Sequence, residues 1–293
     1  MKKIREKNSI LREKVIDFIH RQWENNYKES ENIDIGSEFF EITAMTLFKE
    51  LTRDKRQCKK PFVFRIGGQS GSGKTTQLMP SIKSVVGGNF VDISVRRFAQ
   101  SHPNYAGLLE KFGEGMIREK TNSFALLMLF RIIELLMESH YNILFEVTIL
   151  SPDFENYLAK LAKKNRYDVH FHILSVPHIK SDHWIEKRMI LSKTEGNRVV
   201  LKSSSNFFYD ILPVALAEIM RLKIWTRNDK IFLWNGFDSL PSVSGKIYRN
   251  KKFMKLFEYY RNYDSFECVD EEKLLESKIS WFRRYYSPEE FEF

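Results

Sequence analysis

The sequence has little cysteine, proline or glycine. Its 293 residues include 2 cysteines, 8 prolines and 13 glycines. The two cysteines, Cys58 and Cys268, stand far apart and form no metal-type or redox-type pair. Free thiols suit a reducing compartment, so we expect a cytoplasmic protein whose fold depends on a packed core. No repeat or low-complexity tract is present.

Long apolar runs are also absent. The longest one, FALLMLF continuing to IIELLM, is interrupted by Arg131 and Glu134. It is too short to span a bilayer and predicts a buried helix. The N-terminus is basic, but no apolar segment follows it, so the sequence predicts neither a signal peptide nor a membrane span.

Positive charge is in excess, with 47 Lys and Arg against 38 Asp and Glu, for a net charge of +9. The basic residues gather in MKKIREK, RDKRQCKK and KIYRNKKFMK, with acidic residues interspersed along the chain. This mixture is typical of solvated faces, although the excess also favours phosphorylated or nucleic-acid partners. A polynucleotide kinase is therefore one open hypothesis, and salt-sensitive binding to DNA or RNA would be its signature.

Strand patterns alternate with helical patterns from residue 61 onward. We expect strands at FVFRI, NFVDISV, YNILFEVTI, YDVHFHILSV and KIFLWN. The alternation predicts an α/β fold, a P-loop NTPase or kinase-like parallel sheet with helices on both faces. Three parts are expected: N-terminal helices over 1–60, the core over 61–240 and an aromatic-rich helical appendage over 241–293.

The stretch FRIGGQSGSGKTTQL contains Gly68-x-x-x-x-Gly73-Lys74-Thr75 between an expected strand and an expected helix. This is the context of a phosphate-binding loop, whose glycines turn backbone N–H groups inward at a helix N-terminus. Lys74 is expected to reach the β and γ phosphates of ATP, and the Thr75 hydroxyl to ligate Mg²⁺. The expected nucleotide-binding residues are Gly68, Gln69, Ser70, Gly71, Ser72, Gly73, Lys74, Thr75 and Thr76.

The stretches GGQSGSGKTT, GNFVDISVRRFAQSHPNY, YNILFEVTI and RVVLKSSSNFFYDIL follow one another between about residues 60 and 240. Together they resemble the zeta toxin family, P-loop kinases of bacterial toxin–antitoxin systems. The resemblance implies phosphoryl transfer from ATP to a hydroxyl of UDP-N-acetylglucosamine or a related small-molecule acceptor. It also implies a small antitoxin protein as a partner that blocks the nucleotide site.

Further site residues follow from the same resemblance. On the substrate side it implies Phe98, His102, Glu146 and Thr148. It assigns Arg198 to a lid, where the guanidinium would neutralise the transferring phosphate. Arg188 and Arg198 flank MILSKTEGN, and as a lid pair they would close over ATP and exclude water.

The catalytic carboxylate departs from the family pattern. Arg96 stands where the family has its catalytic aspartate, and an arginine cannot accept a proton because it stays protonated at working pH. Other departures are Ser94, Val147 and Leu150 around the second and third strands, and Ser204 and Ser205 in place of the lid histidines.

Three interpretations of the general base are open. Asp92 is the base if Ser94 to Arg97 loop out before Phe98. Glu146 is the base if the third strand ends there, because catalytic groups gather at the carboxyl ends of parallel strands. In the third interpretation no base exists, and the protein is an ATP-binding pseudokinase that acts through protein contacts.

His170 and His172 alternate on one face of an expected strand. A zinc site would need two more ligands at a usual spacing, and none is visible. The pattern therefore predicts ordinary strand packing.

Overall fold

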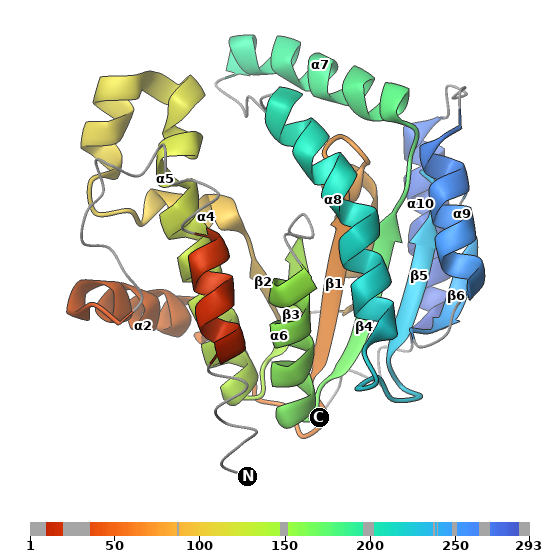
Figure 1. Ribbon diagram of the computed structural model, residues 1–293, viewed down its shortest axis with the longest axis horizontal. Coiled ribbons are helices and arrows are strands. Elements are labelled where there is room, and N and C mark those ends of the chain that lie inside the picture. Colours follow the sequence, from red (N-terminus) through yellow and green to blue (C-terminus); the bar gives the residue numbers. More distant parts are fainter. Residues whose placement is uncertain are drawn as a thin grey trace.

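In the computed structural model, six strands form one sheet in the order β2-β3-β1-β4-β5-β6 (Figure 1). The structure describes residues 10–19, 36–86, 88–146, 152–195, 202–236, 238, 240–247, 251–263 and 270–286. Strands β1 to β5 are parallel, and β6 pairs antiparallel with β5. The strand bounds are β1 (Phe62–Gly68), β2 (Phe90–Ile93), β3 (Asn142–Glu146), β4 (Asp168–Leu174), β5 (Lys230–Trp234) and β6 (Val243–Lys246).

Helices cover both faces of this sheet, which confirms the expected fold class. In Figure 1, α6 and α8 lie in front of the strands and α10 lies behind them. Besides residues 10–19, the helices are α2 (Glu38–Thr52), η1 (Lys74–Leu78), α3 (Met79–Val86), α4 (Val95–Gln100), α5 (Tyr105–Glu138), α6 (Pro152–Lys164), α7 (His178–Glu195), α8 (Lys202–Arg221), α9 (Lys251–Arg261) and α10 (Glu271–Tyr285).

The strand residues divide between two apolar cores. Because side chains alternate along a strand, Val63 of β1 joins the core under α5, α6 and α8, whereas Phe64 and Ile66 join the core under α3 and α10. Five expected strands are present, and all five contribute to both cores. A parallel sheet needs this double cover, since both of its faces are apolar.

The apolar half of α5 is buried as expected, and every side chain from Phe124 to Phe130 is at most 3% exposed. The helix begins at Tyr105, earlier than its apolar pattern indicates, and it turns sharply at Gly113, where φ is +72°. None of the described helices has the length and apolar character that crossing a membrane requires.

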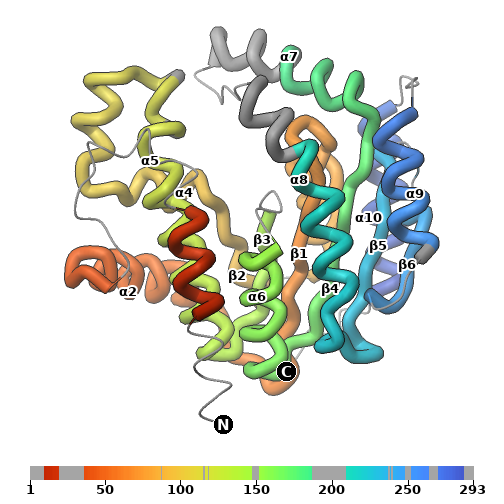
Figure 2. Tube along the Cα trace, viewed as in Figure 1, coloured from red at the N-terminus to blue at the C-terminus, as the bar shows by residue number. Residues whose placement is uncertain are grey.

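The helix of residues 10–19 lies along α5 (Figure 2). Its Leu11, Val15 and Ile19 enter the core, and Arg12 forms a 2.7 Å ion pair with Glu134 of α5. The next helix, α2, begins as expected at Ser37, whose hydroxyl accepts a hydrogen bond from the backbone N–H of Phe40.

The C-terminal region contributes more than helices. Strand β6 was not expected, because VSGK is too short and too polar to show a strand pattern. Helix α10 packs against α3 and η1, and its Phe282 enters the core around Phe64 together with Tyr286, the next residue after the helix. The division into parts 1–60, 61–240 and 241–293 stays a prediction.

Tyr286, just after α10, is buried in a chain of hydrogen bonds on the sheet. Trp234 Nε1 donates to His172 Nδ1 (3.3 Å), so the proton of His172 is on Nε2, which donates to the Tyr286 hydroxyl (3.1 Å). The Tyr286 hydroxyl in turn donates to His170 Nδ1 (2.9 Å), and His170 Nε2 donates to the carbonyl of Asn228 (3.2 Å). Burial lowers the pKa of His170 to about 4 and that of His172 well below its usual value. The histidine pair therefore serves packing, as predicted.

We expect Tyr286→Phe to destabilise the fold by about 1–3 kcal/mol, because it leaves two buried ring nitrogens without a partner. The free energy of unfolding in urea at pH 7 measures this loss. Tyr259→Phe is the matched control, since Tyr259 is 55% exposed on α9. Equal stability of the two variants would contradict the hydrogen-bond chain described above.

Candidate active site at the phosphate loop

The loop that follows β1 lies at the carboxyl edge of the sheet, at the centre of its strand order. Strand β1 pairs with β3 on one side and with β4 on the other. The chain passes from β1 to β2 and β3 on one side and then crosses to β4 on the other. Such a switch point is where open α/β sheets bind their ligands.

Three glycines of the loop have positive φ angles, with +143° at Gly68, +71° at Gly71 and +98° at Gly73. Space is restricted as well. A Cβ at Gly71 would lie 2.3 Å from the carbonyl oxygen of Ser181, and one at Gly68 would lie 2.8 Å from that of Leu174. Both the angle and the close approach therefore require glycine at these two positions.

Two side-chain hydrogen bonds hold the loop to the segment after β4. The Gln69 side-chain amide donates to the carbonyl of Val176, and the Ser181 hydroxyl donates to the carbonyl of Ser70. The sequence did not reveal Val176 or Ser181, because one acts through its backbone and the other through a hydroxyl outside any motif. Two buried atoms of the loop, Gln69 Oε1 and Ser72 Oγ, have no partner among the described residues.

Lys74 lies across the inside of the loop and is 7% exposed. Its ammonium donates to the carbonyls of Gly68 (3.0 Å) and Gln69 (2.7 Å). Thr75 and Thr76 follow on the exposed side of η1. This first turn is a π-helix, a rare form that occurs frequently at functional sites, and it gives way to α3 at Met79, just before Pro80.

Glu146 ends β3 beside Thr75. The Thr75 hydroxyl lies 2.9 Å from both carboxylate oxygens of Glu146. The pairing of β1 with β3 sets this contact, because Glu146 is opposite Ile66 in the register. A hydroxyl and a carboxylate are oxygen ligands that suit Mg²⁺, which binds through one or two protein groups together with nucleotide phosphates. Among the described residues, no larger group of His, Cys, Asp and Glu is gathered to hold a metal.

The model of the family described as zeta toxin matches residues 47–238, which is more than half of the chain. The chain belongs to the zeta toxin family. The resemblance predicted from four sequence stretches is thus confirmed.

Several curated relatives carry toxin names. Toxin PezT of Streptococcus pneumoniae serotype 4 is 34% identical over 47% of this chain and 54% of its own length. Toxin zeta of Streptococcus pyogenes is 26% identical over 57% of this chain and 52% of its own length. Toxin zeta of Enterococcus hirae is 30% identical over 48% of this chain and 49% of its own length. The chain spans about half the length of the curated relatives it matches.

One solved structure, described as a characterisation of the PezAT chromosomal toxin–antitoxin system of Streptococcus pneumoniae, has a similar fold. Its TM-score is 0.63 over 86% of this chain and 97% of that chain, at 21% sequence identity. At this identity the likeness shows a shared fold, which agrees with the sheet order and the phosphate loop described above.

The position of the zeta family aspartate falls in a helix of this chain. Strand β2 ends at Ile93, two residues before the end of the expected strand, and α4 places Arg96 on an exposed turn. The expectation that Ser94 to Arg97 loop out is wrong, because the residues from Val95 onward form helix α4. Asp92 instead forms an ion pair with Lys83 of α3. Of the two candidate carboxylates, Glu146 is the one that contacts the phosphate-loop segment.

Phe98 and His102 pack α4 against α5. Phe98 is fully buried in the core, and its expected contact with a substrate stays a prediction. His102 is 4% exposed, its Nδ1 accepts from the backbone N–H of Asn104 (3.1 Å), and its ring meets the edge of Phe124. Burial lowers the pKa of His102 to about 4, so this ring is neutral at pH 7.

The remaining predicted positions are not described. Thr148 and Arg198 lie outside the described residues, as do Val147 and Leu150. The side chains of Arg188, Ser204 and Ser205 lie outside them as well. The lid of the zeta family pattern therefore stays a prediction.

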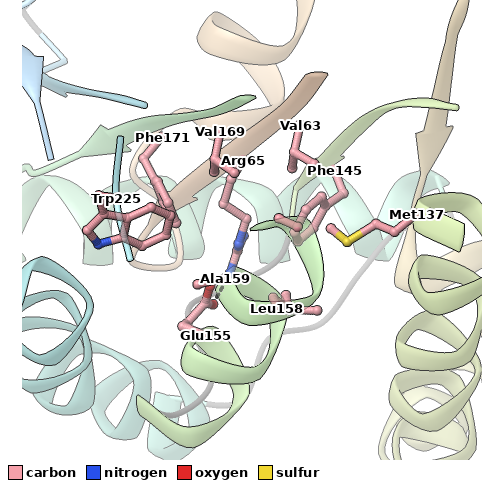
Figure 3. Close-up of a pocket in the computed structure, with 11 residues that line it drawn as sticks. Val63, Arg65, Met137, Phe145, Glu155, Leu158, Ala159, Val169, Phe171 and Trp225 are labelled. Carbon is pink, nitrogen blue, oxygen red and sulfur yellow. Dashed lines mark hydrogen bonds and ion pairs between the residues drawn. The ribbon is translucent and has the colours of Figure 1, made fainter. Parts of the chain in front are cut away.

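A small cavity lies between β1 and α6, on the face of the sheet opposite to α10 (Figure 3). Arg65 reaches across it to Glu155, with a 2.7 Å ion pair between two buried side chains, and the guanidinium lies 4.6 Å from the ring centre of Phe145. The cavity has a volume of about 20 Å³, which is enough for about one water molecule. The cavity is too small for a nucleotide and is part of the core.

We expect Gly71→Ala to destabilise the protein by about 1–3 kcal/mol, because it combines a left-handed φ with a 2.3 Å contact to a backbone carbonyl. Gly88→Ala is the matched control, since its Cβ would meet nothing within 4 Å. Urea denaturation of the two variants measures the difference. Equal effects would show that the loop does not press on Ser181.

Proposed function

We propose that this zeta toxin family protein transfers the γ-phosphoryl group of ATP to a hydroxyl of a nucleotide-sugar such as UDP-N-acetylglucosamine. The observation that supports it best is the contact of Thr75 with Glu146 beside the loop that contains Lys74. Family membership and the resemblance of four sequence stretches support the choice of reaction and acceptor.

The loop and Lys74 would hold the phosphates of ATP. Backbone N–H groups from Gly68 to Thr75 would bind the phosphates, and the Lys74 ammonium would supply a positive charge inside the loop. ATP supplies the transferable phosphoryl group, and Mg²⁺ neutralises charge on its phosphates. Arg198 would add a further positive charge from the lid.

Thr75 and Glu146 can act together because their polar atoms have separate tasks. The Thr75 hydroxyl donates its one hydrogen bond to Glu146, and its oxygen lone pairs remain available to bind Mg²⁺. The Glu146 carboxylate has further acceptor positions, so it can also accept the proton of the sugar hydroxyl. As that proton leaves, the hydroxyl oxygen forms its bond to the phosphorus, and the bond to the departing ADP oxygen breaks.

The proposal includes a partner and a location. A small antitoxin protein is the partner that the family resemblance implies, and a solved structure of similar fold comes from a study of a toxin–antitoxin system. The cytoplasm is the proposed location, because ATP and nucleotide-sugars are both supplied there.

The direct test incubates the chain with Mg²⁺-ATP and a panel of acceptors, followed by mass spectrometry for the addition of one phosphoryl group. The panel contains UDP-N-acetylglucosamine, free N-acetylglucosamine, UDP and an oligonucleotide with a 5′-hydroxyl. We expect product from the nucleotide-sugar. Phosphorylation of the oligonucleotide alone would support a polynucleotide kinase, and ATP binding without any product would overturn the enzymatic proposal.

Two variants then identify the base. We expect Glu146→Gln to lower kcat by about 10²- to 10⁴-fold, the usual contribution of a general base. Asp92→Asn keeps a similar shape on the neighbouring strand and removes the carboxylate that pairs with Lys83, so it should retain activity. The reverse result would transfer the role of base to Asp92.

A further inference from the structure

A lysine of the C-terminal helix is buried behind the phosphate loop. Lys278 of α10 is 0% exposed, and its ammonium donates to the side-chain carbonyl of Gln77 at 3.2 Å. Its Nζ also lies 6.0 Å from the ring centre of Trp234. Burying an ammonium is costly unless it forms hydrogen bonds, so the hydrogen bond to Gln77 stabilises the buried position of Lys278.

Gln77 connects this ammonium to the loop. Its backbone N–H donates to the carbonyl of Gly73 (2.9 Å) within η1. A Cβ at Gly73 would lie 3.3 Å from the amide carbon of the Gln77 side chain and 3.5 Å from its nitrogen. The Gln77 amide therefore lies directly against Gly73, the residue before Lys74. A continuous path of contacts leads from Lys278 through Gln77 to the phosphate loop.

Other charges face the same region. Burial and, to a smaller extent, the nearby ammonium of Lys180 together lower the pKa of Lys278 to about 7, against the opposing effect of the Asp238 carboxylate. Lys180 of α7 donates to the carbonyl of Gly236 (2.9 Å), next to the loop. The other titratable groups on the described elements packed against α10 are Lys83 of α3, which pairs with Asp92, the buried Lys74 of η1, Asp168 and the neutral His170 and His172 of β4, and Lys230 of β5.

We propose that Lys278 is a positioning residue for the phosphate loop, which holds the Gln77 amide against Gly73 and so makes nucleotide affinity depend on α10. The inference rests on the proposed function and deepens it, because it adds a helix from the far end of the chain to the nucleotide site. Lys278 acts through Gln77 and through its charge, without touching the ligand.

The charge predicts a dependence on pH. Nucleotide phosphates close to the loop favour the protonated form of Lys278, so binding raises its pKa above 7 and takes up a proton. Affinity is then highest below about pH 7, where Lys278 is already charged, and falls as the pH rises toward the higher pKa of the complex. The fold responds in the opposite sense, because the unfolded chain binds more protons between pH 7 and 10.5 and stability rises through that window.

The test measures the Kd of Mg²⁺-ADP for the full chain by titration calorimetry at pH 6.5 and pH 8.5. The variants are Lys278→Met, Gln77→Leu, their combination, and Lys273→Met as a control on the exposed side of α10. We expect Lys278→Met to weaken binding about tenfold at pH 6.5, the order of one charge-assisted hydrogen bond, and to reduce the pH dependence. The double variant should be no worse than either single variant, since both interrupt one path. Lys273→Met should match the unaltered chain.

The outcomes separate this inference from the proposed function. If Lys278→Met binds ADP like the unaltered chain at both pH values, the inference is overturned and the proposed function stands. If the chain binds ADP in the expected way but phosphorylates no acceptor, only the proposed function fails. A chain that binds no nucleotide overturns both.

Should Lys278→Met fail to fold, the unaltered chain decides the matter. The number of protons taken up when Mg²⁺-ADP binds at pH 7.5 is obtained from calorimetry in two buffers of different ionisation enthalpy. Uptake of a fraction of a proton supports the role of Lys278, and no uptake overturns it.

Discussion

The parallel pairing of β1 between β3 and β4 is the constraint on which the rest of the site depends. One neighbour places Glu146 opposite Ile66, and the other places Leu174 opposite Gly68. A shift of one residue in either register would turn alternate side chains to the wrong face of the sheet. A shift between β1 and β3 would also separate Thr75 from its carboxylate. The chemistry we propose therefore depends on backbone hydrogen bonds formed well below the loop.

The two faces of the sheet solve the burial of polar groups differently. On one face Arg65 is neutralised by Glu155 and stacked on Phe145, so the charge stays inside the core with a fixed partner. On the other face the two histidines are neutral and the Tyr286 hydroxyl joins them. It accepts a hydrogen bond from His172 Nε2 and donates one to His170 Nδ1. Both solutions compensate the burial of polar groups, but only the second ties the C-terminal region to the sheet.

The sequence was most informative where geometry is local. The spacing of Gly68, Gly73 and Lys74 prescribes a loop almost by itself, and five apolar runs marked five strands correctly. Strand β6 could not be found, since VSGK gains its place from pairing with β5. The end of β2 was misjudged because α4 begins at Val95 with no visible stop signal. Ser181 and Lys278 were missed because folding alone brings them to the loop, and Gln77 was missed because its contact with Lys278 depends on that folding.

The close fit of Gly71 against Ser181 has a consequence for protein engineering. The walls of the loop are the carbonyls of Leu174, Val176 and Ser181, which all come from the segment at the end of β4 and the first turn of α7. A graft of residues 62–78 into another parallel sheet would bring the glycines and lose the walls that shape them. The smallest unit that could be transplanted therefore contains β1 with its loop, the adjacent strand β4 and the first turn of α7.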